Sequence, residues 1–196
     1  MKKLLILLCS LVAITGFAQV NFKLKADGSF QTPSGESYVV VPFQGKSAQE
    51  IFNLLQTNVL SIYRDASKVM NSVENTAIRI RGFAKSGEIF PFITIFEKSL
   101  EGYYDLEFKI RDGRVRVSAP FIEDEVVSVV SEKSQFLFGP VQPQIVSYRE
   151  QLEKHIFEED GSVKKKRVKD VANIEAFLNN IINSILTYQT KYEDDW

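Results

Sequence analysis

Cysteine and histidine are almost absent from this sequence. Among its 196 residues, Cys9 is the one cysteine and His155 the one histidine. An internal disulfide is therefore excluded, and with so few thiolate and imidazole ligands we predict no metal site and no cofactor. A Ser-His-Asp triad would need His155, yet the sequence has no G-x-S-x-G motif and His155 lies in a charged, helix-like segment. The sequence thus predicts a surface histidine and no catalytic residue.

Long apolar runs are confined to the N-terminus, which reads MKKLLILLCSLVAITGFAQV. Two lysines precede an apolar run over residues 4–14, and the small residues Gly16 and Ala18 stand where a signal peptidase would cut. The run is too short for a membrane-spanning helix of about 20 residues, and no second long run follows. We therefore predict a signal peptide over residues 1–18, a mature chain that begins near Gln19 in the periplasm or outside the cell, and no transmembrane segment after signal removal.

Neither sign of charge is in large excess. The formal net charge is −1, and loss of the two leader lysines would lower it to −3. Cys9 lies inside the apolar run and would leave with the leader, so no lipid anchor is expected. A mildly acidic, exported chain does not suit nucleic acid, and we predict no nucleic-acid binding. Hydrophobic residues make up 44% of the chain, which is enough for a core without disulfides.

The first part of the predicted mature chain contains a turn-rich segment, a strand and a helix. Turn-forming residues around Asp27-Gly28 indicate a small hairpin within residues 19–36, and YVVVPF, residues 38–43, is typical of a strand. Ser47 and Glu50 have the spacing of a capping box, which marks the start of a helix. Apolar residues then recur at helical spacing, and we predict an amphipathic helix over residues 48–70.

Four strand candidates follow this helix. NTAIRIRGFA alternates isoleucine with arginine, FPFITIFEK is apolar on both faces, and YYDLEFKIRDGRVRVSAP has the pattern of a β-hairpin around Asp112-Gly113. Asp-Gly favours a two-residue type I′ turn, since that turn needs positive φ. The resulting register places three apolar pairs toward the helix: Ile110 with Val115, Phe108 with Val117, and Leu106 with Ala119.

The C-terminal third is less regular until its last segment. Residues 126–130 are compatible with a strand, residues 139–143 with a loop, and IVSYREQLEKHIF with a short helix. A clear apolar stripe then predicts a long helix from about Asp170. Its continuation through Tyr188, Tyr192 and Trp196 fits either packing on the same core or a dimer contact, so the oligomeric state is left open.

This order of elements resembles a known family. SYVVVPFQGKSAQEIF, the Ile-Arg-Ile-Arg strand and the FKIRDGRVRV hairpin, behind a signal peptide, resemble a secreted bacterial family of unknown function with a TATA-binding-protein-like (TBP-like) fold. The resemblance implies an α+β fold of order β-α-β-β-β-β-α, with an antiparallel sheet and helices packed on one face. It covers residues 37–122, and residues 123–196 are predicted as a mainly helical C-terminal extension. A shared fold implies no shared function with a DNA-binding protein.

The outward face of the predicted hairpin is basic. In the two-residue register like charges oppose each other, Lys109 with Arg116 and Arg111 with Arg114, which costs roughly 0.2 to 1 kcal/mol for each pair. Solvent and the nearby Asp105 and Glu107 are one explanation, and an anionic ligand or protein partner is the other. The candidate binding face consists of six residues: Arg79, Arg81, Lys109, Arg111, Arg114 and Arg116.

These observations favour an exported, non-enzymatic binding or accessory protein of the bacterial cell envelope. The alternative is a small periplasmic hydrolase that uses a Ser/Lys pair, such as Ser162 with Lys165, or a pair of carboxylates from IEDE or FEEDG. A buried pair with shifted pKa values in a concave pocket would favour the hydrolase. A filled core beneath an open sheet face would favour the binding protein.

Overall fold

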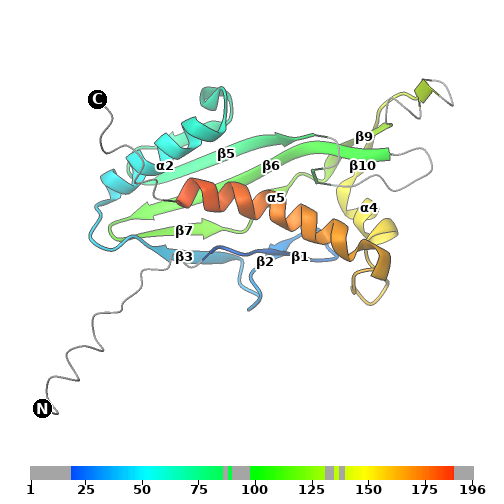
Figure 1. The fold of residues 1–196 in the computed structure, drawn as a ribbon, viewed down its shortest axis with the longest axis horizontal. Helices are drawn as coiled ribbons and strands as arrows, with labels where there is room; N and C mark the ends of the chain where they lie inside the picture. The colour runs from blue at the N-terminus through cyan, green and yellow to red at the C-terminus, as the bar shows by residue number, and fades with distance from the viewer. Residues whose placement is uncertain (1–18, 86–87, 90–97, 131–134, 137–139, 188–196) are drawn as a thin grey trace, which may run out of the picture.

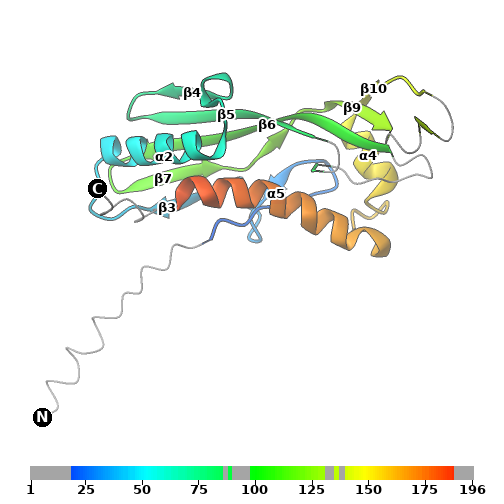
Figure 2. The same ribbon diagram turned by 45° about the horizontal axis from the view of Figure 1, so that its top comes forward.

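An antiparallel sheet covered by helices on one face forms the body of the protein (Figures 1 and 2). The computed structural model describes residues 19–85, 88–89, 98–130, 135–136 and 140–187. In these residues the sheet contains eight strands, and the helices α2 (Ala48–Ile62) and α5 (Val168–Leu186) pack against one of its faces. The predicted α+β class, with an antiparallel sheet, helices on one face and a C-terminal helix, is confirmed. The predicted leader lies outside the described residues.

The longest strand, β6 (Lys98–Arg111), organises the sheet. Along one edge β6 pairs with β5 (Ala77–Ala84). Along its other edge it pairs in turn with three shorter strands, each antiparallel to it. These three are β7 (Arg114–Ser118), β8 (Phe121–Ile122) and β9 (Glu125–Val130). The sheet is extended by β3 (Tyr38–Pro42) beside β7, β4 (Met70–Val73) beside β5, and β10 (Gln144–Ser147) beside β9.

The predicted hairpin is β6–β7, but its turn differs from the prediction. The pairs Ile110 with Val115 and Phe108 with Val117 are confirmed, and all four side chains are buried. Gly113 has a φ of 71°, whereas Asp112 does not have positive φ, so the predicted type I′ turn is wrong. The predicted pairing with Ala119 is also wrong.

That last pairing fails because the β6–β7 ladder ends at Phe108 and Val117, two residues before Leu106 and Ala119. The amide of Ala119 donates to the carbonyl of Ser37 at the end of β3. On the opposite edge of β6, Leu106 pairs with Ile80 of β5, and both side chains are buried. Pro120 follows Ala119 and has no amide hydrogen, and when pairing with β6 resumes at Asp105 and Phe121 the register has shifted by one residue.

Helix α2 is shorter than predicted. Its capping box is confirmed, since the Ser47 side chain accepts from the amide of Glu50 and the Glu50 carboxylate accepts from the amide of Ser47. The helix ends at Ile62, where Tyr63 has an extended backbone, rather than at Met70. A short 3-10 turn, η1 (Ala66–Lys68), and β4 occupy the rest of the predicted helix. The apolar spacing continued beyond Ile62 because Ala66, which is 3% exposed, contacts the core from the 3-10 turn.

The C-terminal third contains more strand than predicted. Strand β9 covers the run that the sequence made compatible with a strand. The predicted short helix is α4 (Tyr148–His155), and its first residues belong to β10 instead, since Ile145 pairs with Val127 of β9. After η2 (Lys165–Arg167), helix α5 begins two residues before the predicted start. Two predicted features lie outside the described residues. They are the strand candidate FPFITIFEK, apart from Lys98, and the end of the apolar stripe at Tyr188, Tyr192 and Trp196.

The N-terminal residues form a small hairpin under α5. Strand β1 (Lys23–Leu24) pairs with β2 (Phe30–Gln31) around a turn in which Gly28 has a φ of 79°. Phe22 and Phe30 belong to the same buried core as the strands of the sheet and α5, so residues from the start, middle and end of the described chain share one core. No helix in the described part of the chain is long and apolar enough to span a membrane.

Candidate functional site

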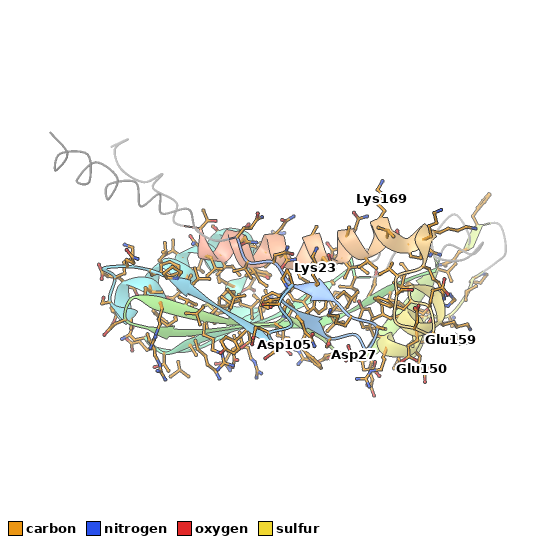
Figure 3. All side chains as sticks on the ribbon, turned by 90° about the horizontal axis from the view of Figure 1, so that it is seen from below. Lys23, Asp27, Asp105, Glu150, Glu159 and Lys169 are labelled. Carbon is orange, nitrogen blue, oxygen red and sulfur yellow. The ribbon has the colours of Figure 1, made fainter. Side chains whose placement is uncertain are left out.

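All six residues of the predicted basic face are exposed on the side of the sheet that the helices leave uncovered. Along β5 the buried Ile78 and Ile80 alternate with the exposed Arg79 and Arg81, and β7 has the same alternation. Figure 3 shows the consequence, with α5 on one side of the sheet and Asp105 of β6 on the other. Strand pleating therefore puts the charged side chains on one open face.

Four of the six residues gather at the end of the β6–β7 hairpin, and we call them the basic cluster. The pairing of Lys109 with Arg116 and of Arg111 with Arg114 is confirmed, so like charges stand directly opposite each other. These side chains line a shallow depression of about 290 Å³ whose remaining wall is Tyr38 and Val40 of β3. The basic cluster consists of Lys109, Arg111, Arg114 and Arg116.

Among the described residues, two members of the basic cluster have an ion-pair or ring partner and two have neither. The Lys109 ammonium lies 3.7 Å from the Glu107 carboxylate, and the Arg116 guanidinium stacks over the Tyr38 ring at 4.2 Å. Within the described residues, Arg111 and Arg114 form no ion pair and no ring contact. Their planar guanidinium groups keep all their donors available for a carboxylate or phosphate, which arginine binds with two parallel hydrogen bonds.

The other two predicted residues lie apart from the depression. Arg79 is paired across the sheet with Glu107, and Arg81 with Asp105. Arg81 also forms an ion pair with Glu123 and stacks over the Tyr103 ring at 4.7 Å. The structure therefore divides the predicted face into a basic cluster at the hairpin end and a charge-compensated region on β5.

Residues that the sequence reasoning missed complete the depression. Tyr38 and Val40 are exposed, at 39% and 49%, on β3, which pairs with β7 and sets Val40 opposite Arg116. The alternation in YVVVP identifies these two as outward residues. It does not identify β7 as their neighbour, because that pairing joins segments more than 70 residues apart.

The groups considered for the hydrolase alternative do not form a buried pair in the described residues. Ser162 and Lys165 are both exposed, and the amide of Ser162 donates to Asp160. The pKa of Asp160 is lowered by hydrogen bonds from Ser162, and the pKa of His155 is lowered by partial burial and by the nearby Lys154. Among the described side chains, no group of three or more His, Cys, Asp or Glu residues is placed to hold a metal ion.

Comparisons with known proteins give structural neighbours only. No family model matches the sequence, and no curated protein matches it. One similar solved structure is a TBP-like protein from Parabacteroides distasonis ATCC 8503, with a TM-score of 0.44, 13% identity, and coverage of 78% of this chain and 92% of that one. Another is a DUF4468 family protein from Bacteroides ovatus ATCC 8483, with a TM-score of 0.45, 9% identity, and coverage of 92% and 95%.

The first of these structures is described as TBP-like and the second as a DUF4468 family member. The α+β architecture itself is established by the sheet and helices of this chain. Similarity at this level carries no activity, ligand or partner to this protein.

Proposed function

We propose that this protein is an exported, non-enzymatic binding or accessory protein of the bacterial cell envelope, and that its basic cluster binds an anionic partner. The leader-like N-terminus supports export, because it combines two lysines, a short apolar run and small residues before Gln19. The basic cluster supports the binding role. Its position on an open sheet face leaves room for a large partner.

One observation carries the binding proposal. Arg111 and Arg114 are directly paired across the hairpin, and neither has an acidic partner in the described residues. Two like charges directly opposite each other on paired strands destabilise the hairpin unless a group of opposite charge offsets their repulsion. An anionic group in the depression between them and Tyr38 would remove the repulsion and gain charge-assisted hydrogen bonds.

The test compares two variants with the same change in net charge. In the first, all four basic-cluster residues are replaced by glutamine. In the control, four exposed basic residues outside the sheet face are replaced: Arg64→Gln, Lys165→Gln, Lys166→Gln and Lys169→Gln. Because both variants lose four positive charges, a difference between them reports the position of the charges rather than the total.

The probes are polyglutamate and vesicles of phosphatidylglycerol with phosphatidylcholine, with vesicles of phosphatidylcholine alone as the neutral control. We expect the wild type and the control variant to bind at least one anionic probe in a salt-sensitive way, and the cluster variant to bind it roughly tenfold more weakly or worse. Equal binding by the two variants, or no binding of any anionic probe by the wild type, would refute the proposal. Folding should survive in both variants, since the replaced side chains are exposed.

A further inference from the structure

Helix α5 holds the first described residues of the chain through a regular row of polar side chains. Asn183, Asn179 and Glu175 lie four residues apart, so they stand one above the other on a single helix face. They contact the backbone of Val20, Phe22 and Leu24 respectively. We call residues 20–24 the strap and the three α5 side chains the polar row.

Each asparagine of the polar row pairs with one strap residue as a neighbouring strand would. The Asn179 side chain accepts from the amide of Phe22 at 2.8 Å and donates to its carbonyl at 2.9 Å. Asn183 does the same with Val20, at 2.9 Å in both directions. A primary amide has both a donor and an acceptor, which lets it imitate a residue of an antiparallel ladder.

The residue spacing of helix α5 and of the strap explains why the hydrogen bonds between them continue over several residues. Four residues of an α-helix rise about 6.0 Å, and two residues of a strand extend about 6.6 Å. Every fourth helix residue therefore meets every second strap residue across the short length of the row. The opposite edge of β1, at the end of the strap, pairs with β2, so its backbone is bonded on both sides.

The polar row binds the backbone of the strap, while the hydrophobic core surrounds its alternate side chains. Val20, Phe22 and Leu24 are 2%, 0% and 5% exposed, whereas Asn21 between them is exposed. At the end of the row Glu175 has no donor. It accepts from the amide of Leu24 at 3.1 Å and from the Lys23 ammonium at 2.8 Å (Figure 3 labels Lys23 beside α5). The site therefore fits an extended segment with alternate apolar residues and a lysine before the last of them.

We propose that the polar row of α5 is a binding site for an extended polypeptide segment, filled here by the chain's own strap and able to accept the same segment from a separate molecule. All hydrogen bonds between the polar row and the strap join residues more than 150 positions apart in the sequence, so the strap reaches the site by tertiary docking rather than by local folding. If the leader is removed after Ala18, the strap is the first segment of the mature chain.

The main experiment cuts the chain without removing any of it. A protease recognition sequence is inserted between Asp27 and Gly28, in the turn that joins β1 to β2, and the folded protein is cut there. The probe is a fluorescent synthetic peptide of residues 19–27. We expect the cut fragment to co-elute with the rest of the protein and to be displaced by the labelled peptide.

A matched peptide tests the backbone contact alone. Methylation of the Phe22 amide nitrogen removes the donor to Asn179 and leaves every side chain in place. This peptide should compete at least about tenfold more weakly than the unmodified one. Equal competition by the two peptides, or loss of the cut fragment from a protein that stays folded, would overturn the proposal.

If the cut protein unfolds, hydrogen exchange on the uncut chain tests whether the polar row binds the strap backbone. Asn183→Ala removes both side-chain bonds to Val20, and Asn180→Ala changes an exposed asparagine on the same helix as a control. Hydrogen exchange at the Val20 amide should become about tenfold faster or more in the first variant and stay unchanged in the control. Unchanged exchange at Val20 in Asn183→Ala would contradict a backbone-binding role for the row.

Discussion

The Asp112 carboxylate accepts a hydrogen bond of 2.7 Å from the backbone amide of Ala48, so the turn of the β6–β7 hairpin caps a helix that begins 64 residues earlier in the chain. The amide of Gly113 donates to the carbonyl of Lys46, and the amide of Phe43 donates to the carbonyl of Gly113. This contact fixes the hairpin end, and with it the basic cluster, against the start of α2. Asp112 is thus a positioning residue for the candidate site.

Asp112→Ala should lower the free energy of unfolding by about 1 kcal/mol, the usual effect of losing a helix N-terminal cap. Chemical denaturation measures the change. Asp112→Asn keeps a side-chain oxygen that can accept the Ala48 amide, so it should retain most of the stability. A loss as large in Asp112→Asn as in Asp112→Ala would show that the charge of Asp112, rather than its hydrogen bond, stabilises the helix.

Gly113→Val should destabilise the protein by about 1 to 3 kcal/mol, because a β-branched residue resists the φ of 71° at this position. Apart from Gly113 and its two chain neighbours, no heavy atom of the described residues lies within 4 Å of a Cβ added there, so the loss would come from the backbone alone. Asparagine tolerates positive φ, and Gly113→Asn should therefore cost less. An unchanged denaturation midpoint in Gly113→Val would contradict the observed turn.

Gly82→Ala should destabilise the protein through a clash with Tyr104 on the neighbouring strand. A Cβ at Gly82 would lie 2.7 Å from Tyr104 Cε1 and closer still to the end of the ring. The ring has little freedom to move, since it is 3% exposed and its hydroxyl lies 2.9 Å from that of Tyr63. We expect a loss of about 1 to 3 kcal/mol, as for other overpacked cores.

A double-mutant cycle checks the cause of that loss. Tyr104→Leu shortens the side chain beneath Gly82, so the combined variant should lose less stability than the sum of the two single changes. Strict additivity would mean that the alanine acts on the strand backbone rather than on the Tyr104 ring.

Glu50 should make the thermal stability pH-dependent in the acidic range. The amide and hydroxyl of Ser47 hold the pKa of Glu50 below its ordinary value of 4.5. A carboxyl group whose folded pKa is lowered stabilises the fold fully above its unfolded pKa, and this contribution is lost as the pH falls through the folded value. The melting temperature of the wild type should therefore fall more steeply below pH 4.5 than that of Glu50→Gln, which keeps an acceptor but does not titrate.

If the protein is exported as proposed, its mature form should begin at or near Gln19. The small residues Gly16 and Ala18 predict the cleavage position, and Cys9 would leave with the leader. Intact mass spectrometry of the protein recovered from the periplasm or medium measures this directly. A mass that retains residues 1–18, or that includes a lipid on Cys9, would show that the leader has been misread.

Local patterns in the sequence were enough to predict which side chains face outward. The alternation in AIRIR and in FKIRDGRVRV depends only on neighbours two residues apart, so Arg79 and Lys109 are exposed as expected. The capping box at Ser47 was predictable for the same reason, since both of its hydrogen bonds lie within one helical turn. The two-residue turn also fixed the opposed pair Arg111 and Arg114 before any tertiary contact was known.

The partners of these elements were decided only by the tertiary structure. Nothing in the sequence of α2 requires it to end at Ile62, because Ala66 continues the apolar spacing. The end is seen only in the structure, in the extended backbone of Tyr63 and in the later pairing of β4 with β5. The depression needs β3 beside β7, and the polar row needs α5 beside the strap, in each case across a long stretch of chain. The spacing of residues along a chain determines which face of a helix or strand a side chain occupies. Which other element packs beside that helix or strand depends on how all the apolar faces together form one core. For this reason the sequence predicted the basic residues, and the fold alone separated Arg79 and Arg81 from the basic cluster.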